Sequence, residues 1–289
     1  MTQDGDTLAA TTEVNQAQRE HWEHEGARLY RDHTETNEAL IGPFGQAMFD
    51  AAHLEPGEVV VDVGCGFGTT TLEAEERVAP TGRVVGVDIS AAMLEGARQR
   101  VAGLDDIELI HADAQTHAFQ PGSFDAVISR FGLMFFDDPT AAFGNLARAL
   151  RPGGRLAFVC PQEPMKSEWV AVAFRAAIAV VGHPPELGHP AAPGAFALAD
   201  KDRLSHMLAD AGFQDVRLDP VTRPVRLGRD LDSAAEYVLA LPEARQLYDG
   251  QSTQLVDALR TALTKAFAPY LGSTGVVLDA TAWLVTAHR

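Results

Sequence analysis

The chain has 289 residues, of which 46% are apolar and 22% are charged, and its formal net charge at pH 7 is −17. This length suits one large α/β domain with a cap, and the composition is that of a globular protein without a membrane span. Residues 1–20 lack the basic start and apolar core of a signal peptide, so we expect a cytoplasmic protein, either a monomer or a homodimer.

The charge balance also restricts the choice of ligand. Nucleic acid is not an expected partner, because proteins that neutralise phosphates normally carry a basic cluster, and the densest one here is three arginines spread over residues 223–229. Cys65 and Cys160 are far apart and share no metal-ligand spacing, so we expect neither a disulfide nor a metal site. The composition favours a small molecule as the substrate.

The N-terminal region is predicted to be helical. Residues 14–31 mix Trp22 and Tyr30 with many charged side chains, and residues 38–54 carry an apolar stripe that indicates core packing. We assign residues 1–54 to an N-terminal helical cap segment.

From residue 58 the pattern changes to alternating strands and helices. The β-branched run at residues 59–61 is typical of a strand buried on both faces. Further strands are predicted at residues 83–88, 107–110, 124–129 and 155–159, and helices at residues 69–78, 90–102 and 139–150. This alternation predicts a parallel sheet with right-handed crossovers, and we assign residues 55–160 to a cofactor-binding core.

The regular alternation ends after Cys160. Residues 161–199 are a predicted lid insertion, because a long Pro/Gly/His-rich loop inside a compact domain is usually functional. Residues 200–289 are predicted to hold the remainder of the core. The elements expected in these two parts are helices at residues 168–181, 200–211, 231–241 and 253–270 and strands at residues 216–218 and 282–288, with a helical insertion at about 230–270.

The glycine-rich loop at residues 64–68 follows the first predicted strand directly. Its glycines allow a tight turn and a close backbone approach, and the next helix presents its N-terminal N–H groups to a negative group. A dinucleotide fingerprint requires Gly-x-Gly-x-x-Gly, but its third position is Thr69, and the glycine falls one residue early, at Gly68. The spacing therefore disfavours NAD, and Cys65 is interpreted as a small filler within the loop.

Two carboxylates follow the next predicted strands. Asp88 ends the second strand, where it can accept both hydroxyls of a ribose, a feature shared with NAD enzymes. Asp113 follows the third strand, where it can accept the exocyclic amine of an adenine. In a parallel sheet both positions lie at the carboxyl edge, which is where ligands bind.

Taken in order, residues 60–68, 87–90, 113–114, 123–127 and 150–156 resemble the motifs of the class I S-adenosylmethionine-dependent methyltransferases. The similarity is nearest to the branch that includes the ubiquinone/menaquinone methyltransferases and many small-molecule enzymes. The resemblance implies an α/β, doubly wound, mostly parallel seven-stranded Rossmann-like sheet of order 3-2-1-4-5-7-6, with an antiparallel last strand and helical cap insertions. The implied cofactor is S-adenosyl-L-methionine.

The resemblance also implies roles for individual residues. Asp62 and the glycine loop would hold the methionine end, Asp88 the ribose, and Asp113 the adenine amine, while the end of the fourth strand would lie near the sulfonium. The predicted cofactor-binding residues are Trp22, Asp62, Gly64, Cys65, Gly66, Gly68, Thr69, Asp88, Ile89, Met93, Asp113, Ala114, Ser129, Arg130 and Phe131.

No catalytic group can be assigned from the sequence alone. His183 and His189 are candidate bases in the lid loop, and the N-terminal His21, His24 and His33 are further candidates. Arg130 could clamp an anionic substrate, or it could form an ion pair with Asp137 or Asp138.

The predicted function is methyl transfer from S-adenosylmethionine to the oxygen, carbon or nitrogen of a small-molecule acceptor, with secondary metabolism as a suitable setting. One alternative is a protein that binds the same cofactor without transferring its methyl group. An NAD-linked oxidoreductase and a macromolecular methyltransferase are weaker alternatives, because the loop spacing opposes the first and the acidic charge opposes the second.

Overall fold

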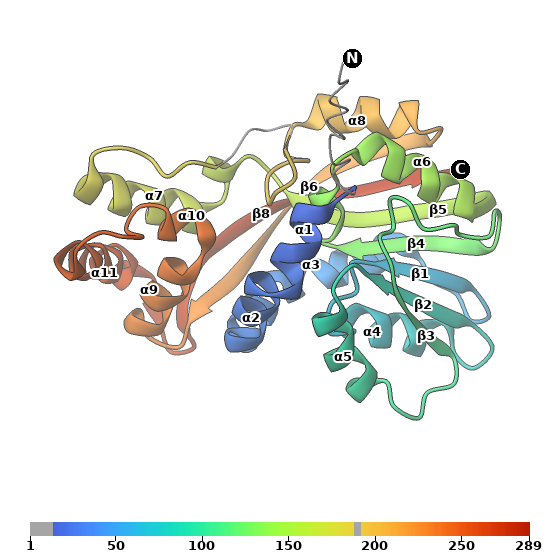
Figure 1. Cartoon of the computed structure of the whole chain (residues 1–289), viewed down its shortest axis with the longest axis horizontal. Helices are drawn as coiled ribbons and strands as arrows, with labels where there is room; N and C mark the ends of the chain where they lie inside the picture. The colour runs from blue at the N-terminus through green and yellow to red at the C-terminus, as the bar shows by residue number, and fades with distance from the viewer. Residues whose placement is uncertain (1–13, 188–191) are drawn as a thin grey trace, which may run out of the picture.

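The computed structural model describes residues 14–187 and 192–289, and one large sheet organises them (Figure 1). Its strand order is β3-β2-β1-β4-β5-β8-β6, and the short β7 pairs with β8. The strands are β1 (Val59–Val63), β2 (Arg83–Asp88), β3 (Ile107–His111), β4 (Phe124–Arg130), β5 (Leu150–Pro161), β6 (Gln214–Gly228), β7 (Leu271–Gly272) and β8 (Gly275–His288). Strands β1 to β5 are parallel, and β8 is antiparallel to both of its neighbours. The predicted sheet order is confirmed, with β8 as the antiparallel last strand.

Helices cover both faces of this sheet. Apolar side chains of α3 and α4 pack on one face with Val60 and Val84, and those of α6 and α8 pack on the other face with Val61 and Val85. Adjacent valines point to opposite faces because side chains alternate along a strand. The helices are α1 (Gln16–Glu23), α2 (Glu25–Asp32), α3 (Thr34–Ala52), α4 (Thr69–Val78), α5 (Ala91–Arg100), α6 (Pro139–Ala149), α7 (Glu168–Val181), α8 (Lys201–Asp210), α9 (Leu231–Ala240), α10 (Pro242–Arg245) and α11 (Thr253–Phe267).

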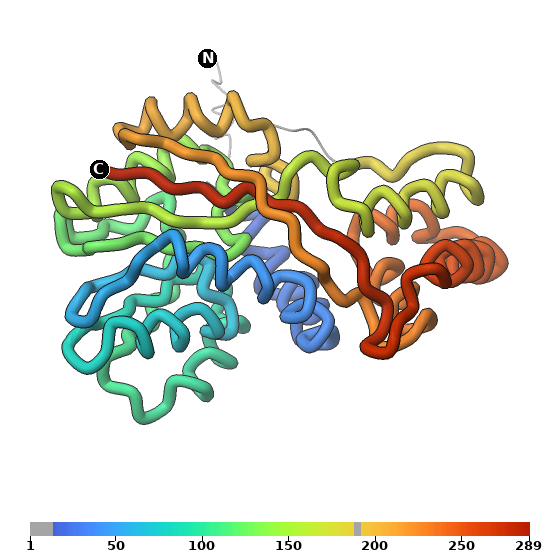
Figure 2. Tube along the Cα trace, turned by 180° about the vertical axis from the view of Figure 1, so that it is seen from behind, coloured from blue at the N-terminus to red at the C-terminus, as the bar shows by residue number. Residues whose placement is uncertain are grey.

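Strands β6 and β8 are much longer than the predicted strands at residues 216–218 and 282–288. They run side by side from the main sheet into the cap (Figure 2). The sequence hides this length because Pro220 and Pro224 interrupt β6, and proline normally argues against a strand interior. Here β6 lies at the edge of the sheet, where proline is tolerated.

The far half of this strand pair carries a separate helical cap. Leu227, Val276 and Leu278 form an apolar cluster with buried side chains of α7, α9 and α11. Figure 1 shows α1 to α3 between this cap and the parallel strands. The N-terminal segment therefore contacts both halves of the molecule.

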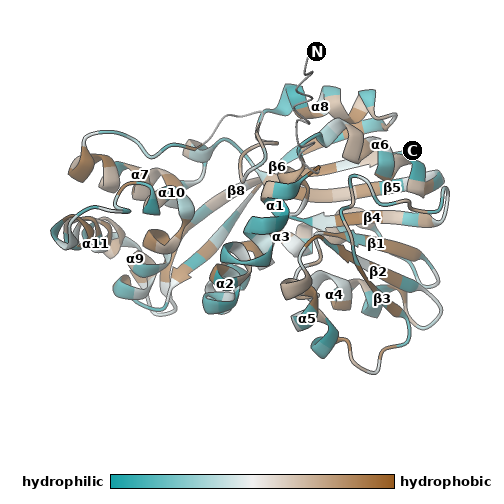
Figure 3. Cartoon of the chain, viewed as in Figure 1, coloured by the Kyte–Doolittle hydropathy of each residue, from teal (hydrophilic) through white to brown (hydrophobic). Residues whose placement is uncertain are grey.

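Apolar residues concentrate in the strands, while the outer faces of many helices are hydrophilic (Figure 3). This separation is the expected result of burying apolar surface between two helical layers. Within residues 14–187 and 192–289, no helix combines the length and the apolar character that crossing a membrane requires.

Arg155 on β5 links the end of α3 to the start of β1. Its guanidinium donates to both carboxylate oxygens of Glu58 and to the backbone carbonyls of Ala52 and His53. The Arg155 and Glu58 side chains are only 18% and 13% exposed. The carbonyls at the end of α3 thus find donors that a helix cannot supply internally.

We expect Arg155→Met to lower the free energy of unfolding by about 2–4 kcal/mol, because it leaves a mostly buried carboxylate and two carbonyls without their donor. Urea unfolding followed by circular dichroism measures the change. Arg217→Met on exposed β6 is the matched control and should shift stability by no more than about 0.5 kcal/mol. Equal losses in the two variants would contradict this role of Arg155.

Candidate functional site

A cavity of about 570 Å³ lies beyond the carboxyl ends of β1, β2 and β4. The N-terminal helices line one side of it, and α7, α9 and α10 line another. This volume is within the usual range of small-molecule sites. The place is also the edge at which open α/β sheets bind their ligands.

The glycine loop forms the floor of the cavity between β1 and α4. Gly64, Gly66 and Gly68 have φ values of 71°, 55° and 78°, which glycine adopts without steric cost. A Cβ on Gly64 would lie 2.9 Å from the Cα of Gly132. The loops that follow β1 and β4 are therefore in direct backbone contact, and only small residues allow it.

Asp88 joins this loop to β2. Its Oδ2 accepts from the backbone N–H of Gly66 at 2.8 Å, and its Oδ1 accepts from that of Ser90 at 2.9 Å. The residue lines the cavity although it is only 8% exposed. Burial raises the pKa of Asp88 to about 6, against the opposing effect of the two backbone hydrogen bonds. At neutral pH it is therefore mostly anionic and able to accept hydrogen bonds.

Asp113, which follows β3 and lines the cavity, is held by the N-terminal segment. Its Oδ2 accepts from Asn15 Nδ2 at 2.8 Å, and its Oδ1 accepts from the Gln115 backbone N–H at 2.9 Å. The Asn15 backbone N–H also donates to Asp137 Oδ2, and the Asp137 backbone N–H donates to Asn15 Oδ1. Trp22 packs edge-on against Phe135 at 5.1 Å between ring centroids. The N-terminal segment thus covers this part of the cavity.

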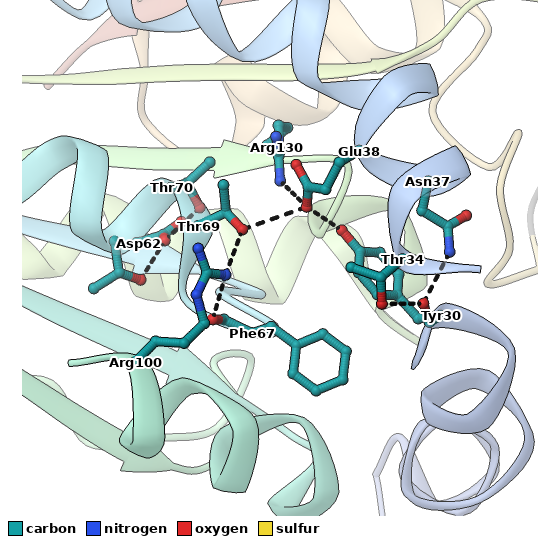
Figure 4. Close-up of polar contacts among 11 residues, drawn as sticks. Tyr30, Thr34, Asn37, Glu38, Asp62, Phe67, Thr69, Thr70, Arg100 and Arg130 are labelled. Carbon is teal, nitrogen blue, oxygen red and sulfur yellow. Dashed lines mark hydrogen bonds and ion pairs between the residues drawn. The ribbon is translucent and has the colours of Figure 1, made fainter. Parts of the chain in front are cut away.

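Arg130 at the end of β4 pairs with a residue that sequence reasoning did not consider. We expected either a free clamp or an ion pair with Asp137 or Asp138, but the partner is Glu38 on α3, at 2.9 Å (Figure 4). Asp138 instead caps α6 through the Ala141 backbone N–H. No local sequence pattern could reveal this pair, because its members are far apart along the chain.

Phe131 follows Arg130 with a φ of 58°. A bulky residue in this left-handed region is strained, and such strain is often found at functional sites. Its ring packs edge-on against Phe44 at 5.6 Å between centroids and lines the cavity. The turn after β4 is therefore held in an unfavourable conformation by its packing.

Most of the residues predicted to bind the cofactor lie together at the cavity surface. Those that line it are Trp22, Gly64, Cys65, Gly66, Thr69, Asp88, Ile89, Met93, Asp113, Ala114, Arg130 and Phe131. Burial raises the pKa of the Cys65 thiol well above its usual value, in keeping with its interpretation as a filler rather than a reactive group.

Three predicted residues lie behind the cavity surface. Asp62 is fully buried, and its Oδ2 accepts from the hydroxyls of Thr70 and Thr71 at 2.6 and 2.7 Å. Gly68 begins α4. The Ser129 hydroxyl donates to the Val63 carbonyl at 2.7 Å. These contacts give all three a role in shaping the two loops, and their direct contact with a ligand stays a prediction.

The candidate bases are scattered. His183 is exposed, donates to its neighbour's carbonyl and does not line the cavity, and His189 lies outside the described residues. His24 and His33 are not among the lining residues, whereas His21 is. Among the histidines of residues 14–187 and 192–289, His21 is the one at the cavity surface.

The cap contributes an apolar compartment that sequence reasoning located but did not resolve into residues. Its helices showed only ordinary amphipathic periodicity, which core packing explains equally well. We define the acceptor compartment as the lining residues Trp169, Val170, Ala173, Phe174, Ala177, Tyr237, Val238, Leu241, Leu247, Leu259 and Leu263.

Comparison with known proteins agrees with this geometry. A family model described as a methyltransferase domain matches residues 60–154. A demethylmenaquinone methyltransferase of Staphylococcus aureus is 32% identical over 175 residues, which cover 57% of this chain and 72% of that protein. The chain belongs to the class I S-adenosylmethionine-dependent methyltransferases. Within them it falls in the quinone methyltransferase-like branch.

Solved structures show the same fold for this methyltransferase. Phosphoethanolamine N-methyltransferase 2 of Haemonchus contortus, in complex with S-adenosylmethionine, aligns with a TM-score of 0.57 at 19% identity, covering 94% of this chain and 59% of that one. The YcgJ protein of Bacillus subtilis aligns with a TM-score of 0.54 at 18% identity, and the alignment covers 85% of this chain and 97% of that one.

The cavity residues fit S-adenosylmethionine, on which this methyltransferase depends. The carboxylate of Asp88 would accept from the ribose hydroxyls, and Asp113 offers an acceptor for the adenine amine. Gly64 and Gly66 line the cavity and carry no side chain, so their backbone can be approached closely by a ligand. The contact of each residue with the cofactor remains a prediction.

Binding of S-adenosylhomocysteine should weaken by up to about tenfold between pH 7 and pH 5, because Asp88, with its pKa of about 6, then becomes protonated and loses an acceptor. Isothermal titration calorimetry measures the affinity. Asp88→Asn should weaken binding at every pH and flatten the pH profile, while Asp105→Asn, at an exposed site, should retain it. If the Asp88→Asn variant still bound S-adenosylhomocysteine with the same pH dependence, the attribution of that dependence to Asp88 would be refuted.

The raised pKa of Asp88 affects stability in the opposite direction to its effect on ligand affinity. The folded chain binds the Asp88 proton more tightly than the unfolded chain, so this group becomes destabilising as the pH rises from about 4 to about 6. Loss of affinity at low pH therefore cannot be ascribed to unfolding caused by Asp88.

We expect Gly132→Ala to weaken S-adenosylhomocysteine binding at least about tenfold. Its Cβ would lie 2.6 Å from the Val63 carbonyl oxygen and 2.8 Å from Ser129 Oγ, so the two loops must move apart. Gly144→Ala is the control, because its Cβ meets only Arg148 Nη1, at 3.8 Å, and should stabilise α6 by about 0.5–1 kcal/mol. Unchanged affinity in Gly132→Ala would show that the loop contact is dispensable.

Proposed function

We propose that this methyltransferase transfers the methyl group of S-adenosylmethionine to a small, largely apolar acceptor bound in the acceptor compartment. The observation that carries the proposal is the division of one cavity into two parts. One part has the glycine loop, Asp88 and Asp113, and the other is built from aliphatic and aromatic side chains of the cap. Such a compartment suits an uncharged ring system with an oxygen, carbon or nitrogen nucleophile.

The cofactor supplies an electrophilic methyl group on a good, neutral leaving group. The protein therefore contributes mainly by holding the acceptor in line with that methyl group and by excluding water. Trp169, Phe174 and Tyr237 suit the second task, because they line the compartment with aromatic surface. His21 is available to take a proton from an acidic acceptor, whereas an amine needs only to arrive neutral.

The charges of the lining argue against an anionic acceptor. Arg130 is the only Lys or Arg among the cavity-lining residues that the structure describes, and it lies against Glu38 and Gly45 of α3 rather than among the residues of the acceptor compartment. The S. aureus relative is a demethylmenaquinone methyltransferase, and a quinone is an apolar acceptor of this kind. A step in secondary metabolism is a further setting that such a compartment would suit.

The proposal is tested by incubating the protein with S-adenosylmethionine and a panel of phenolic, quinol and amine acceptors. We expect release of S-adenosylhomocysteine with apolar ring compounds and little release with phosphorylated or carboxylated ones. Cofactor binding with no release across the panel would favour the alternative in which the cofactor is bound without methyl transfer. Release only with anionic acceptors would contradict an apolar compartment.

A change in the size of the compartment provides a second test. Ala177→Phe on α7 should raise the acceptor KM about tenfold or more, because its side chain would fill space in the compartment. The affinity for S-adenosylhomocysteine should not change. Ala179→Phe, at an exposed position of the same helix, is the matched control and should leave both values unchanged. An unaffected KM in Ala177→Phe would place the acceptor elsewhere.

A further inference from the structure

We propose that Arg130 binds the carboxylate of the cofactor's methionine end and that Glu38 is the positioning residue that holds it for this purpose. The inference rests on the S-adenosylmethionine dependence of the site. It assigns Glu38, which belongs to no recognised sequence motif here, a part in cofactor recognition. It also assigns Arg130 to the cofactor instead of to an anionic substrate, one of the two roles that the sequence allowed.

The first argument is the distribution of charge. The methionine end of the cofactor carries a carboxylate, and Arg130 is the only Lys or Arg that lines the cavity within the described residues. The nearby Arg100 is exposed and donates to the Phe67 carbonyl and the Thr69 hydroxyl on the outside of the loop. Burial raises the pKa of Asp62, and the positive charge of Arg130 opposes this rise together with the Thr70 and Thr71 hydrogen bonds. Arg130 therefore lies near the loop after β1.

The second argument is the way in which Glu38 holds the guanidinium. Glu38 Oε1 accepts from Arg130 Nη2 at 2.9 Å, from the Tyr30 hydroxyl at 2.6 Å and from the Thr69 hydroxyl at 3.4 Å (Figure 4). Although burial raises the pKa of Glu38, these partners hold it below its usual value. Glu38 is thus a fixed anion that joins α2, α3, α4 and β4.

The third argument is that the Arg130 guanidinium retains donors for a ligand. Within the described part of the chain, its one hydrogen bond is the one to Glu38. Glu38 itself is not among the cavity-lining residues, whereas Arg130 is. Glu38 therefore holds the guanidinium without lining the cavity itself, and its side chain is 29% exposed where that of Arg130 is 8% exposed. An arginine supported in this way can still offer two parallel N–H groups to a carboxylate.

The fourth argument is the shape of α3. A Cβ on Gly45 would lie 3.2 Å from Arg130 Cδ, and one on Gly42 would lie 3.9 Å from its Nη1. Glycine inside a helix is less stable than alanine by about 1 kcal/mol, so the glycine at position 45 needs a reason. Gly45 lets the Arg130 side chain lie close along α3, whereas the distance at Gly42 is ordinary van der Waals contact.

The test compares two ligands that differ at the methionine end. S-adenosylhomocysteine has the amino and carboxyl groups, and 5′-methylthioadenosine lacks them. By isothermal titration calorimetry, we expect Arg130→Met to weaken binding of S-adenosylhomocysteine about 10- to 100-fold, the range of a charge-assisted pair, with unchanged binding of 5′-methylthioadenosine. Arg130→Lys, which keeps the charge, should restore part of the preference.

Glu38→Gln should weaken S-adenosylhomocysteine binding about three- to tenfold. The double variant with Arg130→Met should bind S-adenosylhomocysteine no more weakly than Arg130→Met alone, because Glu38 acts through Arg130. The matched control is Glu35→Gln, one turn earlier in α3, where an exposed ion pair with Arg226 and Arg229 is removed. This control should bind both ligands as the unaltered protein does.

Two results would overturn the proposal. If Arg130→Met weakens the binding of both ligands equally, Arg130 only maintains the fold of the site. If Arg130→Met leaves S-adenosylhomocysteine binding unchanged and raises the acceptor KM, Arg130 serves the acceptor. If the unaltered protein binds neither ligand, the cofactor assignment itself fails. Binding of both ligands with a failed acceptor panel would leave the role of Arg130 intact and refute only the acceptor class.

Discussion

The site depends on the contact between two backbone turns, the one after β1 and the one after β4. Gly64 and Gly132 approach so closely that a Cβ on Gly64 would lie 2.9 Å from the Cα of Gly132. Asp88 fixes the first turn through the Gly66 N–H, and the packing of Phe131 fixes the second. Because both turns are held, polar groups from β2 and β4 are oriented toward the same cavity before a ligand arrives, which lowers the free-energy cost of binding.

The N-terminal segment makes this floor part of an enclosed site. Asn15 holds Asp113, the residue proposed for the adenine amine, and Glu38 holds Arg130, the residue proposed for the methionine carboxylate. The same segment reaches the cap, because the Tyr237 hydroxyl on α9 donates to Asn37 at 2.9 Å. One stretch of chain is therefore bonded to both parts of the cavity, and these three hydrogen bonds each join residues more than ninety positions apart.

Much of this architecture could be predicted from the sequence, because it follows from local patterns. Buried β-branched runs, the glycine loop and Asp88 at a strand end each occupy a few consecutive residues. Together they predicted a parallel sheet and the ligand-binding role of its carboxyl edge, while the strand order was implied by the family resemblance. The Glu38–Arg130 pair and the hold of Asn15 on Asp113 could not be predicted, since they join distant segments without any periodic signal. The cap lining could not be resolved either, because an amphipathic helix has the same pattern whether it faces a core or a cavity.

The prolines that hid β6 in the sequence also affect how the molecule meets other chains. An edge strand exposes unpaired backbone groups to which a foreign strand can bond, and this is a common route to aggregation. Pro220 and Pro224 are exposed on that edge and have no N–H to offer. Together with the exposed Arg217 they make β6 a poor template for strand addition. A long strand that supports a cap can therefore lie at the border of the sheet without recruiting further copies.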